Sequence, residues 1–133
     1  MCNAQHRVNT RSLASQYAQF AIALTKSTGF AQMMNQLLAE LRKIEGVEDR
    51  PSPVAGGCAL FYFGKEFAHF HNTNELDLRL TKAIIRKLGM QHPPDSLHHP
   101  TRSPNSAWIE VRFSLASDIP KLVELVKLAI TKL

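Results

Sequence analysis

The stretch from Cys58 to Leu80 constrains the fold most, because it alternates apolar and polar residues and is interrupted twice by turn-forming residues. Gly64-Lys65 suits a two-residue type II′ hairpin loop, since glycine accepts the positive φ that the first position needs. Asn72-Thr73-Asn74 suits a three-residue turn. Side chains alternate across a strand, so the stretch predicts three antiparallel strands with two distinct faces.

One face of these strands is predicted to be apolar and to carry the core. It comprises Ala59, Phe61, Phe63, Ala68, Phe70, Leu76, Leu78 and Leu80. The opposite face comprises Cys58, Leu60, Tyr62, Phe67, His69, His71, Glu75, Asp77 and Arg79. In this register His69 faces Asp77, and His71 faces Glu75. A one-residue slip would exchange the faces of a strand, and the alternation in residues 76–80 argues against a slip there.

Helical patterns precede the strands. Apolar residues at helical spacing predict a first helix near residues 12–26, which Ser27-Thr28-Gly29 would break. Thr28 is then a plausible N-cap for a second helix that reaches Ile44. Residues 48–57 contain two prolines and two glycines and are predicted to form a loop.

Alternating helical and strand patterns also follow the central stretch. They predict a short helix over 82–88 with Thr81 as its N-cap, a long loop over 90–106, a fourth strand over 107–114 and a last helix capped by Ser117. The fold class predicted is α+β. It has two layers, with an antiparallel sheet of about four strands and helices packed mainly on one face. The 133 residues are predicted to form a single domain in which residues 1–11 are flexible.

Composition narrows the class of protein. The net charge is +5, but the basic residues are dispersed over the outer faces of the predicted helices, which disfavours a nucleic-acid-binding module. No apolar run approaches the roughly 20 residues of a membrane span. The cysteines, Cys2 and Cys58, form no CxxC pair. We therefore expect a cytoplasmic protein without a disulfide framework.

The polar face carries the only dense cluster of chemically useful side chains. His69 and His71 alternate on one strand, so their side chains point the same way about 7 Å apart. Two imidazoles so placed can share a metal, and Glu75, Asp77, Cys58 or a loop histidine could complete its ligand shell. With Glu75 the pattern is HxH…E, like that of cupins. Spacing alone favours half-exposed histidines bonded to the opposite carboxylates. No metal is therefore assigned, and any metal would be held by His69, His71 and Glu75.

A catalytic couple of His69 and Asp77 is a further possibility, because a carboxylate that orients an imidazole is half of a general-base device. A nucleophile in a recognisable context is missing. Cys58 and Ser106 are candidates only by their expected proximity. The sequence leaves open whether a reaction is catalysed, and it indicates no particular cofactor.

Three runs of the chain resemble the small "luciferase family" domain, a domain family of unknown function. They are LRKIEGVEDR, GCALFYFGKEFAHFHNTNELDLRLTKAIIRKLG and HHPTRSPNSAWIEVRFSLASDIPKLVELVKLAI. The resemblance covers roughly residues 33–131, so residues 12–28 lie outside it. Its matched positions include His69, His71, Asp77, His99 and Trp108, while Ala68 and Ala107 stand where the family has glycine. The resemblance implies a fold more than a reaction.

The function predicted is binding of a small molecule or a protein partner through one sheet face. The candidate binding residues are His69, His71, Asp77, Arg79, His99 and Trp108. The alternatives are a cupin-like metal-dependent enzyme and, less favoured, a basic nucleic-acid-binding module. A homodimer through the exposed sheet face or an unpaired edge strand stays open.

Overall fold

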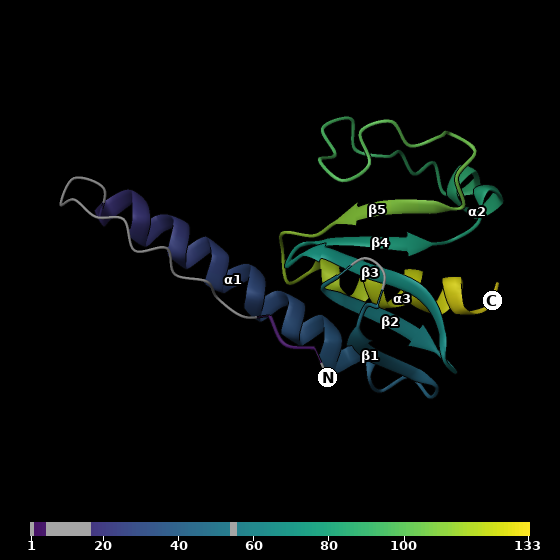
Figure 1. Cartoon of the computed structure of the whole chain (residues 1–133), viewed down its shortest axis with the longest axis horizontal. Helices are drawn as coiled ribbons and strands as arrows, with labels where there is room; N and C mark the ends of the chain where they lie inside the picture. Colours follow the sequence, from purple (N-terminus) through teal and green to yellow (C-terminus); the bar gives the residue numbers. More distant parts are fainter. Residues whose placement is uncertain (1, 5–16, 54–55) are drawn as a thin grey trace.

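The computed structural model describes residues 2–4, 17–53 and 56–133, with side chains for all of them except residues 17–28. The elements in chain order are α1 (Tyr17–Leu41), β1 (Val47–Pro51), β2 (Cys58–Tyr62), β3 (Lys65–Asn72), β4 (Glu75–Arg79), α2 (Lys82–Lys87), β5 (Trp108–Arg112) and α3 (Asp118–Ile130) (Figure 1). Most of the segment predicted to be flexible, and residues 12–16 of the first predicted helix, lie outside the described residues.

The five strands form one antiparallel sheet in the order β1-β2-β3-β4-β5, each strand beside its sequence neighbour. The two-layer α+β prediction is confirmed, with one strand more than expected. The additional strand, β1, lies in the predicted loop and pairs with β2 from Val47↔Tyr62 to Pro51↔Cys58. Pro51 is tolerated because it ends an edge strand, where its missing N–H costs no ladder hydrogen bond.

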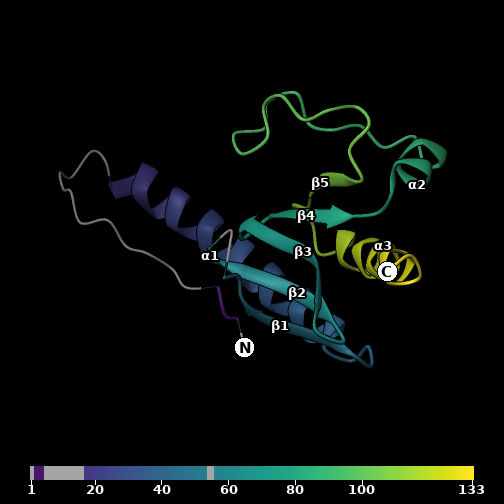
Figure 2. The ribbon, with the colours of Figure 1, turned by 45° about the vertical axis from the view of Figure 1, so that its right-hand side comes forward.

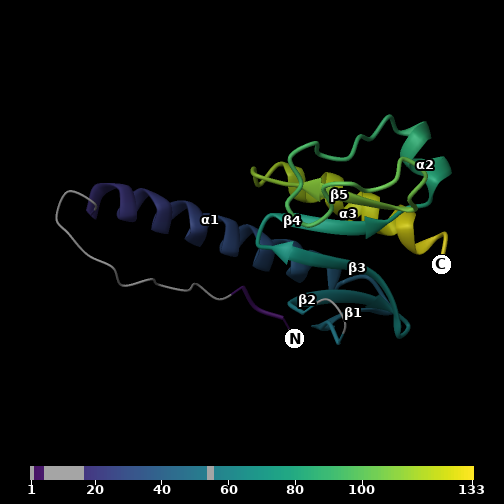
Figure 3. The ribbon, with the colours of Figure 1, turned by 45° about the horizontal axis from the view of Figure 1, so that its top comes forward.

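The first helix is continuous where a break was predicted. α1 runs from Tyr17 to Leu41 through Ser27-Thr28-Gly29, so the predicted N-cap at Thr28 is wrong. A single glycine within a helix costs about 1 kcal/mol, which packing of the neighbouring turns overrides. Figures 1 and 3 show the N-terminal half of α1 extending past the sheet.

The β2–β3 hairpin differs from prediction by one position. Its loop is Phe63-Gly64, both with positive φ as a type I′ turn requires, instead of Gly64-Lys65. The strands then pair as Ala59↔His69 and Leu60↔Ala68. This slip exchanges the faces of β2, so Cys58 and Leu60 enter the core. Phe63 is 70% exposed instead of buried.

Two irregularities in β3 move further side chains. The first is a bulge opposite Leu60 and Phe61, where Phe67 is the extra residue of β3. Phe67 therefore enters the core together with its neighbour Ala68. The other lies between Phe70 and Asn72, because the β3–β4 turn is the two residues Thr73-Asn74. The predicted pairing of His69 with Asp77 is confirmed, whereas Asn72 and not His71 faces Glu75.

The core lies between the sheet and the pair α1 and α3, which cover the same sheet face (Figure 2). Its main members are Met34, Leu37, Leu38 and Leu41 of α1, Leu60, Phe67, Phe70, Leu76, Leu78, Ile109 and Phe113 of the sheet region, and Ile119, Leu122, Val126 and Ala129 of α3. Thr81 caps α2 as predicted, through Oγ1 and the Ile84 N–H. Ser117 precedes α3 but forms no side-chain cap hydrogen bond. None of the described helices is long and apolar enough to span a membrane.

A disulfide joins Cys2 to Cys58, although the sequence predicted none. The two residues are 56 positions apart, so their spacing gave no signal. Cys2 is held beside α1 because its N–H donates to Asp49 Oδ2 (2.6 Å) and its carbonyl accepts from Arg42 Nη2 (2.9 Å). Because its sulfur is bonded and lies in the core, Cys58 is not a nucleophile for the histidine face.

Candidate functional site

Four side chains converge on the sheet face opposite α1 and α3, and we name them the histidine group: His69, His71, Asp77 and His99. One ligand atom from each lies within 4.8 Å of all the others. His71 Nε2 is 2.9 Å from His99 Nε2. Asp77 Oδ2 is 3.3 Å from His99 Nε2, 3.5 Å from His69 Nε2 and 3.9 Å from His71 Nε2. Strands β3 and β4 and the long loop (residues 90–106) therefore supply one site.

Asp77 is the anionic centre of this group, with a side chain that is 2% exposed. Arg102, in the long loop, donates two hydrogen bonds to Asp77. Its Nη1 donates to Oδ1, and its Nη2 donates to Oδ2, the latter at 2.7 Å. Burial acts to raise the pKa of Asp77, but the Arg102 hydrogen bonds and charge act against burial, and the pKa ends below its usual value. Asp77 is therefore ionised at neutral pH.

Two of the imidazoles are neutral at the same pH. Burial, followed by the neighbouring His98 and His69, lowers the pKa of His71 to about 4, although Asp77 acts in the opposite direction. Burial and the charge of Arg102 lower the pKa of His99. Neutral imidazoles beside a carboxylate are in the protonation state that a metal ligand requires.

The long loop is fixed to the sheet by polar contacts on both sides of His99. The His99 N–H donates to Ser96 Oγ (3.0 Å), and that hydroxyl donates to the buried Glu110 Oε1 (3.1 Å). His92 Nε2 donates to the His99 carbonyl (2.8 Å). Because the backbone of His99 is held from both sides, its ring is positioned over β4.

Aromatic side chains and one carboxylate surround the group. The ring of His98 stacks on His71 with a centroid distance of 4.3 Å. Trp108 lies beside His69 at 5.4 Å. Glu66 Oε1 lies 3.3 Å from His69 Nδ1, on the side of the ring away from Asp77. This contact lacks hydrogen-bond geometry, because His69 Nδ1 is buried without a hydrogen-bond partner among the described residues, so Glu66 contributes a negative charge beside the ring.

The structure brings most of the predicted binding residues together. His69, His71, Asp77 and His99 form the group, and Trp108 borders it. Arg79 ends β4 opposite Trp108, but no hydrogen bond or ion pair joins it to the group among the described residues. Glu75, the predicted third metal ligand, lies outside the group with Oε1 3.5 Å from Arg112 Nε.

Arg102 and Glu66 are members of the site that sequence reasoning missed. A signal for Arg102 existed, because a buried aspartate needs a cation and residues 90–106 contain no lysine and no other arginine. No such signal existed for Glu66, since its approach to His69 depends on the irregularity in β3.

The predicted cupin-like pattern is present only in part. Two histidines of one strand do converge with a carboxylate, but the sheet is open, with β1 and β5 at its edges. A cupin requires a double-sheet jelly roll. The histidine group is therefore a site on an open α+β sheet.

Comparison with known families identifies the segment that carries this site. Residues 64–129 match the family described as Luciferase domain. No curated protein and no solved structure matches the chain. The matched segment contains the whole histidine group and Arg102, so the resemblance noted from the sequence is confirmed where the site lies. Residues 64–129 of this chain are thus similar to the Luciferase domain family.

Proposed function

We propose that this protein binds one divalent transition-metal ion through His69, His71, His99 and Asp77, and uses it as a Lewis acid. The observation that carries the proposal is the convergence of three imidazole Nε2 atoms and one carboxylate oxygen within 4.8 Å. The four side chains come from two strands and a loop, so the fold itself assembles them. The name of the family carries no part of this argument.

The distances within the group support a single shared ion. Metal–nitrogen bonds of about 2.0–2.1 Å place two ligand atoms of a tetrahedral site about 3.3 Å apart, and wider coordination angles increase that separation to about 4 Å. The separation between His71 and His99 is 2.9 Å, those between Asp77 and the three histidines run from 3.3 to 3.9 Å, and all the ligand atoms lie within 4.8 Å of one another. Small rotations of the side chains would bring all four atoms into bonding distance.

The ligand types indicate which metals suit the site. Imidazole nitrogens suit zinc, iron, nickel and copper, whereas the absence of a thiolate from the group disfavours metals that need sulfur. A bound ion of this class polarises a substrate oxygen or lowers the pKa of a bound water. His99 is the most exposed ligand, with a side chain 30% exposed, so substrate would approach from the side of the long loop.

A metal-free binding site is the second candidate. It is favoured by the Asp77–Arg102 pair, which already compensates the buried charge without a metal. In this case the face formed by His69, His71, Asp77, Arg79, His99 and Trp108 holds a small organic molecule or a protein partner. Flat ligands would stack on Trp108 and His98.

The cellular setting stays a prediction. A cytoplasmic location was expected from the two isolated cysteines, but disulfides persist mainly in oxidising compartments. The Cys2–Cys58 bond therefore favours a compartment where thiols are oxidised.

Elemental mass spectrometry of untagged protein, purified without chelator, tests the metal proposal. We expect about one zinc, iron, nickel or copper ion per chain, lost in a His69→Ala/His71→Ala double variant. His98→Ala is the matched control, because His98 stacks on His71 but is not a ligand. Metal-free protein that also fails to take up these ions in equilibrium dialysis would contradict the proposal. Ligand-induced shifts in Tm would then support the metal-free site.

A further inference from the structure

Arg79 is the one arginine of the described residues that contacts no other described side chain. It ends β4 and is half-buried, yet it makes no hydrogen bond, ion pair or ring contact there. Each of the other described arginines has such a contact: Arg42, Arg50, Arg86, Arg102 and Arg112. A guanidinium is always charged, and partial burial removes some of its water, so it favours an anionic partner.

Arg79 lies on the same sheet face as the histidine group, next to Trp108. Side chains alternate along a strand, so Arg79 shares the face of Asp77 and lies about 7 Å further along β4. The residue opposite Arg79 on β5 is Trp108, whose ring centroid lies 5.4 Å from that of His69. Trp108 therefore lies between Arg79 and the histidine group.

The backbone holds this end of β4 in a fixed place. The N–H groups of Leu80 and Thr81 both donate to the carbonyl of Ala107, the residue before Trp108, at 2.9 and 3.1 Å. Thr81 has a φ of 82°, which strains a β-branched residue. Strain of this kind persists only where the surrounding structure imposes it, and it concentrates at functional sites. A constrained frame therefore presents Arg79 and Trp108 side by side.

The charge of the histidine face also favours an anion. Asp77 and Glu66 carry negative charge there, and Arg102 carries positive charge. With the divalent ion of the proposed function in place, positive charge exceeds negative charge even before Arg79 is counted. This step rests on the proposed metal, whereas the lack of a described partner for Arg79 does not depend on it.

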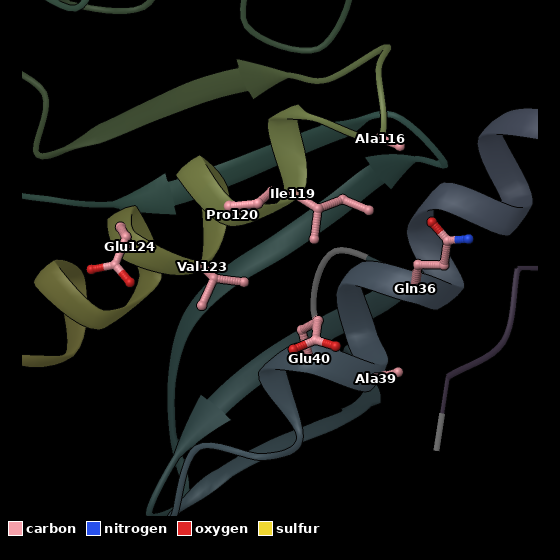
Figure 4. Close-up of a pocket in the computed structure, with 8 residues that line it drawn as sticks. All are labelled: Gln36, Ala39, Glu40, Ala116, Ile119, Pro120, Val123 and Glu124. Atoms are coloured by element: carbon pink, nitrogen blue, oxygen red, sulfur yellow. The ribbon is translucent and has the colours of Figure 1, made fainter.

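The groove between α1 and α3 is less suited to an anion. It lies on the helix side of the sheet and has a volume of about 580 Å³ (Figure 4). Its lining includes Glu40 and Glu124, and no basic residue lines it. Like charges repel an anion from this groove, so the histidine face is the favoured place.

We propose that the histidine face binds a flat organic anion, whose carboxylate or phosphate pairs with Arg79 and whose ring stacks on Trp108. A guanidinium binds either acidic group through two parallel hydrogen bonds. The indole supplies a large apolar surface for the ring. A molecule held in this way extends from Arg79 over Trp108 toward the histidine group, where its other end reaches the proposed metal.

Fluorescence of the single tryptophan tests this proposal, because the chain contains no tryptophan except Trp108. Benzoate, phenyl phosphate and neutral benzamide are each titrated into the full chain. At least one of the two anions should bind about tenfold more tightly than benzamide, and the one that does so identifies the acidic group. A probe in the groove between α1 and α3 lies on the other side of the sheet and should leave the signal unchanged.

Arg79→Gln removes the charge and keeps a polar side chain. It should weaken binding of the anion at least about tenfold and leave binding of benzamide unchanged. Arg50→Gln is the matched control, because Arg50 lies on the edge strand β1 and pairs with Glu48. This control should bind the anion as wild type does. Both variants should retain the metal, since neither arginine belongs to the histidine group.

The same titrations on chelator-treated protein separate this proposal from the proposed metal. A metal-free chain that still binds the anion through Arg79 would contradict the metal and support the anion contact. Equal affinity of wild type and Arg79→Gln for the anion would overturn the anion contact, whether or not a metal is present. Binding of benzamide as tight as that of both anions, or binding of neither anion, would also overturn it.

Discussion

Two buried aspartates lie on opposite sides of the same sheet, and each is bonded by an arginine. Asp49 lies on the helix side with Arg42, and Asp77 lies on the histidine side with Arg102. Their side chains are 3% and 2% exposed. In both cases burial acts to raise the pKa of the carboxyl. Arg42 with the Cys2 N–H at Asp49, and Arg102 with His69 and His99 at Asp77, outweigh burial, so both pKa values fall below the usual range. Burial and charge alone therefore do not distinguish the two aspartates.

The neighbours of each carboxylate do distinguish them. Asp49 accepts hydrogen bonds from Arg42 Nε (2.7 Å), Arg42 Nη2 (2.8 Å) and the Cys2 N–H (2.6 Å), all of which tie chain segments together. Asp77 has the same kind of arginine contact, and three imidazole nitrogens lie within 3.9 Å of it. Three imidazoles gathered around one carboxylate exceed what compensation of its buried charge requires, because Arg102 already pairs with it. On this comparison we propose that Asp49 is a structural residue and that Asp77 is a functional one.

The largest effect on stability is expected from the disulfide on the helix side. It closes a chain segment of 56 positions, for which chain entropy gives a stabilisation of about 4 kcal/mol. Cys2→Ser should lower the free energy of unfolding by roughly this amount in chemical denaturation. Metal uptake should be unchanged in this variant. Loss of metal on removal of the disulfide would show that the two sides of the sheet are not independent.

Asp77→Asn should have the next largest effect, on metal affinity. Removal of a direct ligand should weaken binding by more than about 100-fold, since even outer contacts are worth 10–100-fold. Asp49→Asn is the matched control and should retain the metal. Competition titration with a chelating indicator measures both. Equal affinities of the two variants would contradict the division between structural and functional aspartates.

Asp49→Asn should instead lower stability, by about 2 kcal/mol, because Arg42 loses the charge of its buried partner. The pKa of Asp49 is lower in the folded protein than in the unfolded chain, where it is about 3.9. The ionised carboxylate therefore stabilises the fold above pH 3.9, and this stabilisation is lost as the pH falls through the pKa of the folded state. The variant should lack this part of the acid dependence. Urea unfolding at pH 7 and at pH 3 measures it, and equal pH dependence in both proteins would contradict the assignment.

Arg102→Lys should give the smallest effect. A lysine keeps the charge but loses the two-pronged contact with Asp77, so metal affinity should fall about tenfold. Arg42→Lys makes the same exchange beside Asp49 and should leave metal affinity unchanged. If Arg102→Lys binds metal as tightly as wild type, Arg102 does not position Asp77.

The sequence predicted the helix-and-sheet layering and half of the site because local patterns encode both. The alternation in β4 placed Asp77 correctly, and the alternation in β5 placed Trp108 on the same side. The face of β2 was predicted wrongly, because Phe63-Gly64 forms the turn and moves the register by one residue. A type I′ turn with a phenylalanine at positive φ has no strong sequence signal.

The remaining parts of the site depend on contacts between distant segments. Residues 90–106 have no periodic pattern, so neither the approach of Arg102 to Asp77 nor that of His99 to His71 follows from spacing. The Cys2–Cys58 bond is equally non-local. Glu75 was preferred as a metal ligand because it completes a cupin-like HxH…E pattern, but the two-residue turn places Asn72, and not His71, opposite it.

X-ray absorption spectroscopy of the metal-loaded protein tests the central claim most directly. A second group of ligand atoms exists on the helix side, at Cys2, Asp49 and Cys58, but its sulfurs are joined in the disulfide. Binding at the histidine group predicts nitrogen and oxygen neighbours at about 2.0–2.2 Å, with the outer-shell scattering of imidazole rings. Sulfur neighbours at about 2.3 Å would place the metal at the cysteines and contradict the account.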